Sequence, residues 1–260
     1  MPKLKTLSFA VSVFIMLVLA ISWLTRFNYS WTAWKPATCM PEACFCEAQR
    51  PGTVAQPANT WSSLGFVLVG LLILSGRIAT RVTSNFSMAH TTVYSCALIF
   101  TGLGSTFYHA SLTFVGQFFD VMGMYLLGVF ILLYNLAQIR PLRAQRFVGS
   151  YVALNLVLAV LLIILPEMRR YLFGVLIVLA LFWAYHPRRA TSAATARKFL
   201  AAAVATLLLA FFSFLLDLTR VLCVPESWLQ GHALWHLGGA LSAWLLYQYY
   251  THLTHEQKPS

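Results

Sequence analysis

Long runs of apolar residues alternate with short polar segments along almost the whole chain. A membrane-spanning helix needs about 20 predominantly apolar residues, and eight stretches approach that length. They lie at roughly 7–25, 59–76, 91–110, 117–137, 147–165, 171–186, 199–222 and 232–251. Nearly every face of these stretches is apolar, so the pattern predicts helices without indicating which face meets which neighbour. The only long polar interval, 26–58, separates the first stretch from the other seven.

Composition supports the same interpretation. The 260 residues are 59% hydrophobic and only 10% charged, and the mean hydropathy is +0.72. Soluble domains carry about a quarter charged residues, so we predict an integral membrane protein. The formal net charge of +11 does not indicate a nucleic-acid partner, because the basic residues cluster in the gaps between apolar runs.

The basic residues also predict the orientation. If all eight stretches span the membrane, one side holds Lys3, Lys5, Arg77, Arg81, Arg140, Arg143, Arg146, Arg188, Arg189, Arg197 and Lys198. The opposite side holds fewer, together with most of the acidic residues. The positive-inside rule then places both termini in the cytoplasm. The exterior side would face a periplasm or an organelle lumen.

We therefore predict an all-α, polytopic transmembrane bundle with a seven-helix core and one additional N-terminal transmembrane helix. Residues 1–58 would form that helix and an exterior cysteine-containing loop, 59–252 the bundle, and 253–260 a cytoplasmic tail. The first helix could instead be a cleaved signal peptide. Because 21–26 lacks a small-residue cleavage site, we expect a retained signal anchor.

Four of the five cysteines fall on the exterior side, where disulfides persist: Cys39, Cys44, Cys46 and Cys223. Cys96 lies inside an apolar stretch and is predicted to be a small core residue.

A few ionisable residues interrupt the apolar stretches, and such groups at membrane depth are usually functional. The predicted topology brings His109, His232, His236 and Asp120 to one depth near the exterior face. His232 and His236 are four residues apart, so they share one helix face, and Ser105 and His109 have the same spacing.

Three histidines with an open position for water are typical of a catalytic zinc site. Zinc lowers the pKa of bound water to near 7. A carboxylate such as Asp120 could then accept the proton of that water, and a hydroxyl such as Ser105 could stabilise the oxyanion. We interpret these five residues as one hydrolytic site.

Each residue also has a simpler explanation. A histidine pair four apart is, by itself, more often interfacial or hydrogen-bonded than metal-binding. Ser105 could bond a backbone carbonyl one turn back, and the nearby Gly102 and Gly104 are more typical of close helix packing. For Asp217, three residues before Arg220, we expect an ion pair within one helix, with support of the site as the alternative.

These residues resemble the alkaline ceramidases. The shared pattern is Gly-x-Gly-Ser-x-x-x-His-x-x-Leu at 102–112, followed by Gln117, Asp120, Met124-Tyr125, and His-x-x-x-His at 232–236. Cys46-Glu47 and Asn59-Thr60-x-Ser62 are similar to the same family's amino-terminal region. The resemblance covers roughly 44–250.

The resemblance implies a seven-helix intramembrane zinc amidase, in a superfamily that includes the adiponectin and progestin receptors. It implies zinc on His109, His232 and His236, Asp120 as general base, and Ser105 as a stabiliser of the tetrahedral intermediate. The implied reaction is hydrolysis of ceramide to a sphingoid base and a free fatty acid. It also implies a disulfide between Cys46 and Cys223, which leaves Cys39 and Cys44 as a pair that could close a small ring.

Three features depart from the family pattern, and one of them is Val121, which stands where the family tends to have another acid after the aspartate. Eukaryotic members carry an acidic calcium site before their first helix, whereas here Glu47 is followed by no second acid before Asn59. Calcium prefers six or more oxygen ligands, so we expect calcium binding to be absent or weak. The additional helix at 7–25 also lies outside the pattern.

Three functions remain open at this point. The first is a zinc-dependent lipid amide hydrolase, with ceramide or another lipid amide or ester reaching the site from the bilayer. The second is a receptor or sensor on the same scaffold with a structural zinc site. The third is a structural membrane protein without a metal. The sequence does not indicate the oligomeric state.

Overall fold

The computed structural model describes residues 2–40, 44–80, 86–185 and 194–253, and these ranges contain helices without β-strands. All eight predicted stretches are helical, so the predicted fold class is confirmed. The helices are α1 (Pro2–Leu24), α2 (Pro57–Thr80), α3 (Met88–Ser111), α4 (Phe114–Ala137), α5 (Ala144–Ile164), α6 (Arg169–Ala184), α7 (Ala194–Leu218) and α8 (Gly231–Thr251). Short 3-10 turns, Thr25–Phe27 and Pro166–Met168, follow α1 and precede α6. Most of the predicted tail, 254–260, lies outside the described residues.

Five of these helices are long and apolar enough to cross a membrane: α1, α2, α4, α5 and α7. The remaining described helices differ for identifiable reasons. α6 has only 16 residues, whereas α3 and α8 are long enough but carry histidine, serine, threonine and glycine side chains. Most of these polar residues are buried inside the bundle.

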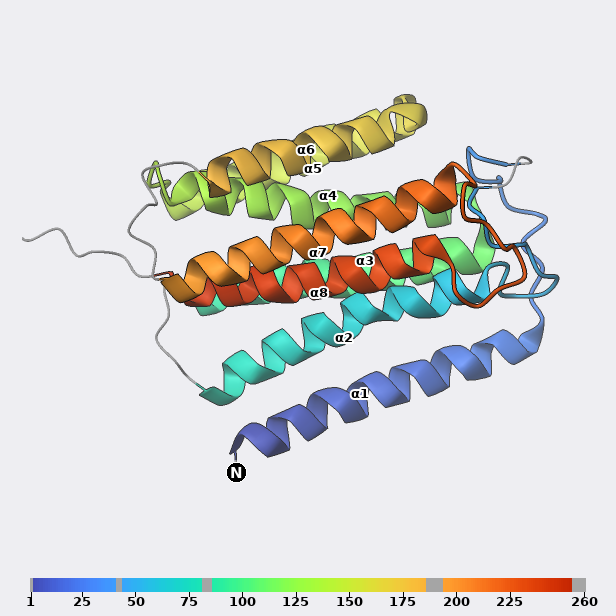
Figure 1. Cartoon of the computed structure of the whole chain (residues 1–260), viewed down its shortest axis with the longest axis horizontal. Coiled ribbons are helices and arrows are strands. Elements are labelled where there is room, and N and C mark those ends of the chain that lie inside the picture. Colours follow the sequence, from blue (N-terminus) through green and yellow to red (C-terminus); the bar gives the residue numbers. More distant parts are fainter. Residues whose placement is uncertain (1, 41–43, 81–85, 186–193, 254–260) are drawn as a thin grey trace, which may run out of the picture.

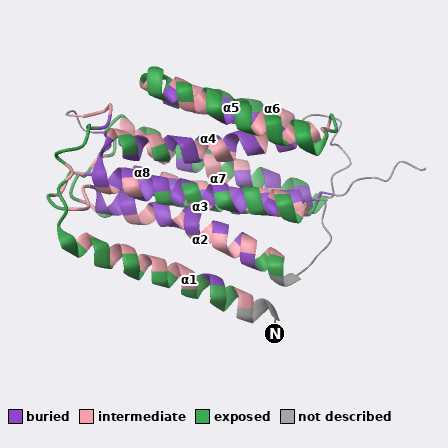
Figure 2. Cartoon of the chain, turned by 180° about the vertical axis from the view of Figure 1, so that it is seen from behind, coloured by how far each residue is buried: buried purple, intermediate pink, exposed green. Residues whose placement is uncertain are grey.

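The helices run roughly parallel or antiparallel to one another, and α3 and α8 lie at the centre (Figure 1). α2 packs against both of them, α7 packs on α8, and α4 packs on α3. α5 and α6 cover the outer side of α4, and α1 lies outside α2. The burial of the helices agrees with their positions in the bundle. The central helices α3 and α8 are largely buried, whereas the peripheral helices α1, α5 and α6 are largely exposed (Figure 2).

Glycines bring α3 unusually close to its two neighbours. A Cβ atom added at Gly102 would lie 2.9 Å from the Ser63 carbonyl oxygen of α2. One added at Gly104 would lie 2.6 Å from the Phe119 carbonyl oxygen of α4. Small residues allow this backbone approach in membrane bundles. The close packing expected of Gly102 and Gly104 is therefore present.

A two-residue turn connects α3 to α4 at the end of the bundle where the predicted site residues lie. Leu112 ends α3 in the left-handed conformation, with φ 49°, and its N–H bonds to the Tyr108 carbonyl. Thr113 then caps α4 by accepting a hydrogen bond from the Gly116 N–H. This short turn fixes the last turn of α3 beside the first turns of α4.

The prediction for Cys96 is wrong. Its thiol is free and lies on the exposed side of α3, not in the core. Apolar residues occupy most faces of α3. The sequence pattern therefore did not distinguish the exposed side of this helix from its packed side.

Candidate metal centre and hydrolytic site

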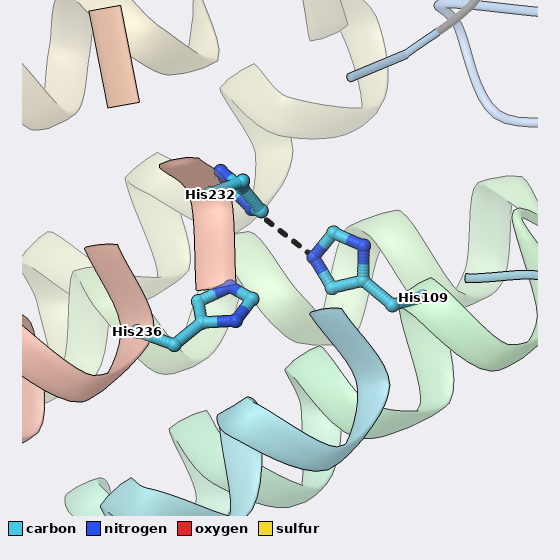
Figure 3. A group of neighbouring side chains, drawn as sticks. All are labelled: His109, His232 and His236. Atoms are coloured by element: carbon cyan, nitrogen blue, oxygen red, sulfur yellow. Dashed lines mark hydrogen bonds between the residues drawn. The ribbon is translucent and has the colours of Figure 1, made fainter. Parts of the chain in front are cut away.

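Three histidines from two helices meet in the interior of the bundle. His109 lies in the last turn of α3, and His232 and His236 lie in the first two turns of α8. All three are buried, and their ligand nitrogens lie within 4.8 Å of one another (Figure 3). The four-residue spacing places both α8 histidines on the face that meets α3. These three residues could hold a metal ion.

The hydrogen bonds of His109 leave one of its nitrogens available as a ligand. Nδ1 lies 2.9 Å from Gln56 Oε1, which can only accept a hydrogen bond, so Nδ1 carries the proton. Nε2 therefore has the lone pair, and it lies 3.2 Å from Nε2 of His232. A metal-ligating histidine typically donates its second N–H to such an oxygen.

His236 is oriented in the same way by α2. Its Nδ1 lies 2.9 Å from Ser62 Oγ. The Ser62 hydroxyl proton is donated to the Asn59 carbonyl oxygen, so Ser62 accepts from Nδ1. Nε2 of His236 is again the nitrogen with the lone pair, and it lies 3.3 Å from Ser105 Oγ.

His232 is fixed through its backbone and its ring. Its N–H donates to Asp217 Oδ2 at 3.0 Å. The Phe45 ring stacks on the imidazole, with centroids 3.8 Å apart and planes at 21°. The other ring nitrogen, Nδ1, is buried and lacks a hydrogen-bond partner among the described residues. A buried nitrogen without a hydrogen-bond partner is costly.

The predicted ion pair between Asp217 and Arg220 is wrong. Asp217 is fully buried, and its two carboxylate oxygens accept from the backbone N–H groups of Cys46 and His232, each at 3.0 Å. Arg220 lies beyond the end of α7 with a positive φ of 59°, which turns the chain away from the helix. Asp217 therefore supports the position of His232, which is the alternative that the sequence left open.

Ser105 and Asp120 lie beside the histidines. Ser105 is buried one helical turn before His109, and its Oγ lies 3.0 Å from the Oγ of Ser63, whose single proton is donated to the Asn59 carbonyl oxygen at 2.8 Å. The Ser105 hydroxyl interacts with the half-buried Asp120 carboxylate. The structure thus places Ser105 between His236 and Asp120, and all five predicted residues come together.

The loop between α1 and α2 closes this end of the bundle and carries residues that the sequence analysis missed. Its contributions are the Gln56 contact to His109 and the Phe45 stack on His232. Gln56 is 1% exposed, and its Nε2 donates to the Glu47 carbonyl oxygen at 3.0 Å. A polar residue directly before Pro57 and the start of α2 was the available sequence signal for Gln56. No comparable signal marked Phe45.

Two disulfides hold this loop. Cys39 is joined to Cys44, and Cys46 is joined to Cys223 across 177 residues. The second bond attaches the loop to the segment between α7 and α8. Phe45 lies between the two bonded cysteines Cys44 and Cys46, so its position over His232 is constrained on both sides.

Glu47 caps a helix in this structure. Its two carboxylate oxygens accept the backbone N–H groups of Ala58 at 2.6 Å and Asn59 at 2.9 Å, in the first turn of α2. Burial raises the pKa of the Glu47 carboxyl above its ordinary value, and these two hydrogen bonds oppose that shift. Because both oxygens are engaged with the backbone, weak or absent calcium binding remains our prediction.

The nitrogen donor set fits a transition metal ion. Neutral imidazoles are ligands of zinc and related divalent ions, whereas calcium and magnesium prefer oxygen. The two assigned tautomers leave Nε2 of His109 and Nε2 of His236 as lone-pair nitrogens, which is consistent with a centre built for such an ion. The residues present therefore fit zinc, the metal that the sequence predicts, and they equally fit related divalent transition-metal ions.

Comparison with known protein families identifies the scaffold. The sequence model of the ceramidase family matches residues 41–260, which include the second half of the loop before α2, the seven helices α2 to α8 and all five site residues. No curated protein sequence matches the chain. The match extends over far more than half of the chain, and α1 lies outside it. The chain belongs to the ceramidase family.

Proposed function

We propose that the protein is a zinc-dependent intramembrane amidase that hydrolyses ceramide, or a closely related lipid amide, to a long-chain amine and a fatty acid. Ceramidase family membership supports a ceramidase-like hydrolase. The observation that carries the proposal is the convergence of three buried histidines with Ser105 and Asp120.

The three histidines would hold zinc through the converging side of their rings. When bound, the ion would act as a Lewis acid that activates water and polarises the scissile carbonyl. Gln56, Ser62 and Asp217 would keep the three rings in the orientation that this binding requires.

Asp120 and Ser105 would perform the proton transfer and charge stabilisation. Asp120 would take a proton from the attacking water as the C–O bond forms. The Ser105 hydroxyl, which contacts both His236 and Asp120, would donate its proton to the oxyanion of the tetrahedral intermediate. Asp120 would then return its proton to the departing nitrogen as the C–N bond breaks, which gives a carboxylate and an amine.

The surroundings of the site support a lipid substrate. The site residues lie inside a bundle of apolar helices, so a molecule dissolved in the bilayer would reach them more readily than a water-soluble amide. We place both termini in the cytoplasm and the site near the exterior face. The four disulfide-bonded cysteines at the site end support this orientation, because disulfides persist outside the cytoplasm. We retain the division into 1–58, 59–252 and 253–260.

The test uses purified full-length protein in detergent with zinc supplied. We expect release of fatty acid from ceramide, and a loss of activity of about 10²- to 10⁴-fold in Asp120→Asn. His109→Ala should reduce both the bound metal and the activity. His252→Ala is the matched control, because His252 is exposed at the other end of α8.

The outcomes separate the alternatives. Hydrolysis of another lipid amide or ester in place of ceramide would retain the chemistry but change the substrate. Stoichiometric zinc without hydrolysis of any lipid tested would contradict the proposal and favour a receptor or sensor. Absence of bound metal, with unchanged stability in His236→Ala, would favour a structural protein.

A further inference from the structure

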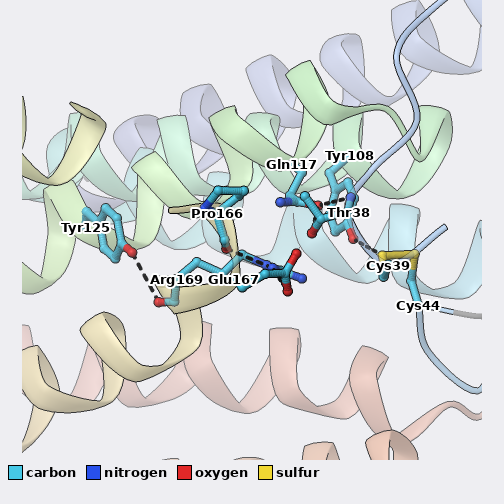
Figure 4. Close-up of polar contacts among 9 residues, drawn as sticks. All are labelled: Thr38, Cys39, Cys44, Tyr108, Gln117, Tyr125, Pro166, Glu167 and Arg169. Atoms are coloured by element: carbon cyan, nitrogen blue, oxygen red, sulfur yellow. Dashed lines mark hydrogen bonds and ion pairs between the residues drawn. A yellow bond between two sulfur atoms is a disulfide. The ribbon is translucent and has the colours of Figure 1, made fainter. Parts of the chain in front are cut away.

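A buried arginine faces the same interior region as Asp120 and has no role in the chemistry described above. Arg169 is the first residue of α6 and is 8% exposed. Both of its side-chain contacts use Nη1 alone, to the Pro166 carbonyl oxygen at 2.9 Å and to Glu167 Oε2 at 3.5 Å (Figure 4). The Glu167 side chain is 75% exposed, so this ion pair is weak.

The remaining donors of the Arg169 guanidinium, Nε and Nη2, have no acceptor among the described residues. A largely buried guanidinium is costly unless its donors are satisfied, so an anionic partner would stabilise Arg169. The Arg169 charge acts on the Asp120 carboxylate and on the phenols of Tyr108 and Tyr125. Tyr125 of α4 donates a hydrogen bond to the Arg169 carbonyl oxygen at 3.1 Å, so the start of α6 is held against the helix that carries Asp120 (Figure 4).

Gln117 supplies a second unsatisfied donor. Its Oε1 accepts from the N–H and the hydroxyl of Thr38, at 2.9 and 3.1 Å. Its Nε2 is buried and has no partner, and the whole residue is 1% exposed. Gln117 and Asp120 are three residues apart on α4, so they share a face of that helix. Figure 4 draws Gln117 and Arg169 in one polar region between the loop before α2 and the start of α6.

We propose that Arg169 and the Gln117 amide form a subsite that binds the carboxylate of the fatty acid released by hydrolysis. This inference rests on the proposed function, which converts a neutral amide into a carboxylate beside the negative charge of Asp120. The planar fork of arginine and an amide N–H are the donors that a carboxylate requires. The subsite would draw the new carboxylate away from Asp120 and slow its release.

Binding to purified full-length protein tests this directly, without relying on activity. Labelled palmitate and hexadecanol share a chain length but only the first has a carboxylate. We expect wild-type protein to prefer palmitate, and Arg169→Met to weaken palmitate binding about 10- to 100-fold with little effect on hexadecanol. Arg169→Lys should restore part of the preference, because lysine keeps the charge but not the fork.

Gln117→Glu is a sharper variant, because it keeps an oxygen for Thr38 and replaces the Nε2 donor with a second oxygen. It should also abolish the palmitate preference. Arg26→Met is the matched control, because Arg26 is an exposed arginine after α1 and should leave the preference unchanged. A palmitate preference that survives in Arg169→Met would overturn the proposal. So would a preference that is lost only after chelation, since the metal would then bind the carboxylate.

The two proposals fail in different ways. If ceramide is hydrolysed but palmitate neither binds preferentially nor inhibits, the subsite is wrong and the proposed function stands. If palmitate binding depends on Arg169 but no lipid amide is hydrolysed, the subsite stands as a fatty-acid site and the proposed function is wrong.

Discussion

At the residue scale, the hydrogen bonds of each histidine determine which of its two ring nitrogens is available to a metal ion. His109 and His236 use Nδ1 for a hydrogen bond to the protein and retain Nε2 for a ligand. The partner of His109 is Gln56, a loop residue rather than part of a neighbouring helix. The orientation of His109, the candidate metal ligand on α3, therefore depends on the loop before α2.

Gln56→Leu should weaken metal binding about 10- to 100-fold, because His109 would lose the acceptor that fixes its tautomer. Competition of the purified protein with a chromophoric chelator measures the affinity. Gln49→Leu in the same loop is the control, because Gln49 is exposed and its amide contacts only Met40. Equal affinities for the two variants would show that Gln56 does not position the ligand.

At the element scale, α3 is held between α2 and α4 by backbone contacts. A Cβ atom added at Gly123 of α4 would lie 2.5 Å from the Thr101 Cα of α3. Neither backbone can move away without shifting the helix that carries Ser105 and His109. The packing of these two helices is therefore linked to the geometry of the site.

Gly123→Ala should destabilise the protein by about 1–3 kcal/mol, because the added methyl group overpacks the contact between α3 and α4. Gly149→Ala is a matched change on α5, where an added Cβ meets no atom within 4 Å. That variant should be neutral or slightly stabilising, by up to about 1 kcal/mol. Thermal unfolding in detergent compares the two. A Gly123→Ala protein as stable as the wild type would contradict this account of the packing.

At the scale of the whole molecule, the Cys46–Cys223 bond joins the two ends of the seven-helix bundle at the site. It links the loop before α2 to the segment before α8. Asp217 adds a second connection, because it bonds to the backbone of both Cys46 and His232. The loop before α2, the candidate metal ligand His232 and the end of α7 are thus joined to one another.

Replacing both Cys46 and Cys223 with serine should lower the stability by about 2–5 kcal/mol and also weaken metal binding. The Cys39–Cys44 bond spans only five residues, so its removal should have a smaller effect on stability. Cys96→Ser serves as the control for the loss of a thiol. Unfolding temperature and chelator competition, measured on the same samples, provide the two readouts. Loss of stability with unchanged metal affinity would limit the bond to a structural role.

Much of the fold and part of the site were predictable. Apolar runs of about 20 residues can only be satisfied as helices in a membrane, so the length pattern gave all eight helices. Histidines and carboxyl groups are rare in such runs, which made His109, His232, His236 and Asp120 visible. By contrast, Cys96 and the ion pair of Asp217 were predicted wrongly and Arg169 was not singled out, because the roles of these residues depend on which helix face packs inward.

The sequence by itself determined the helices, the family resemblance and the identities of the five residues at the centre, because these follow from composition and local spacing. Only the tertiary structure decided how those residues are held. Gln56, Phe45 and Asp217 act on the histidines across distances in the sequence that no helical period encodes. In a chain whose helices are apolar on nearly every face, the direction of each side chain is set by packing and by the disulfide-bonded loop, and not by the pattern of residues.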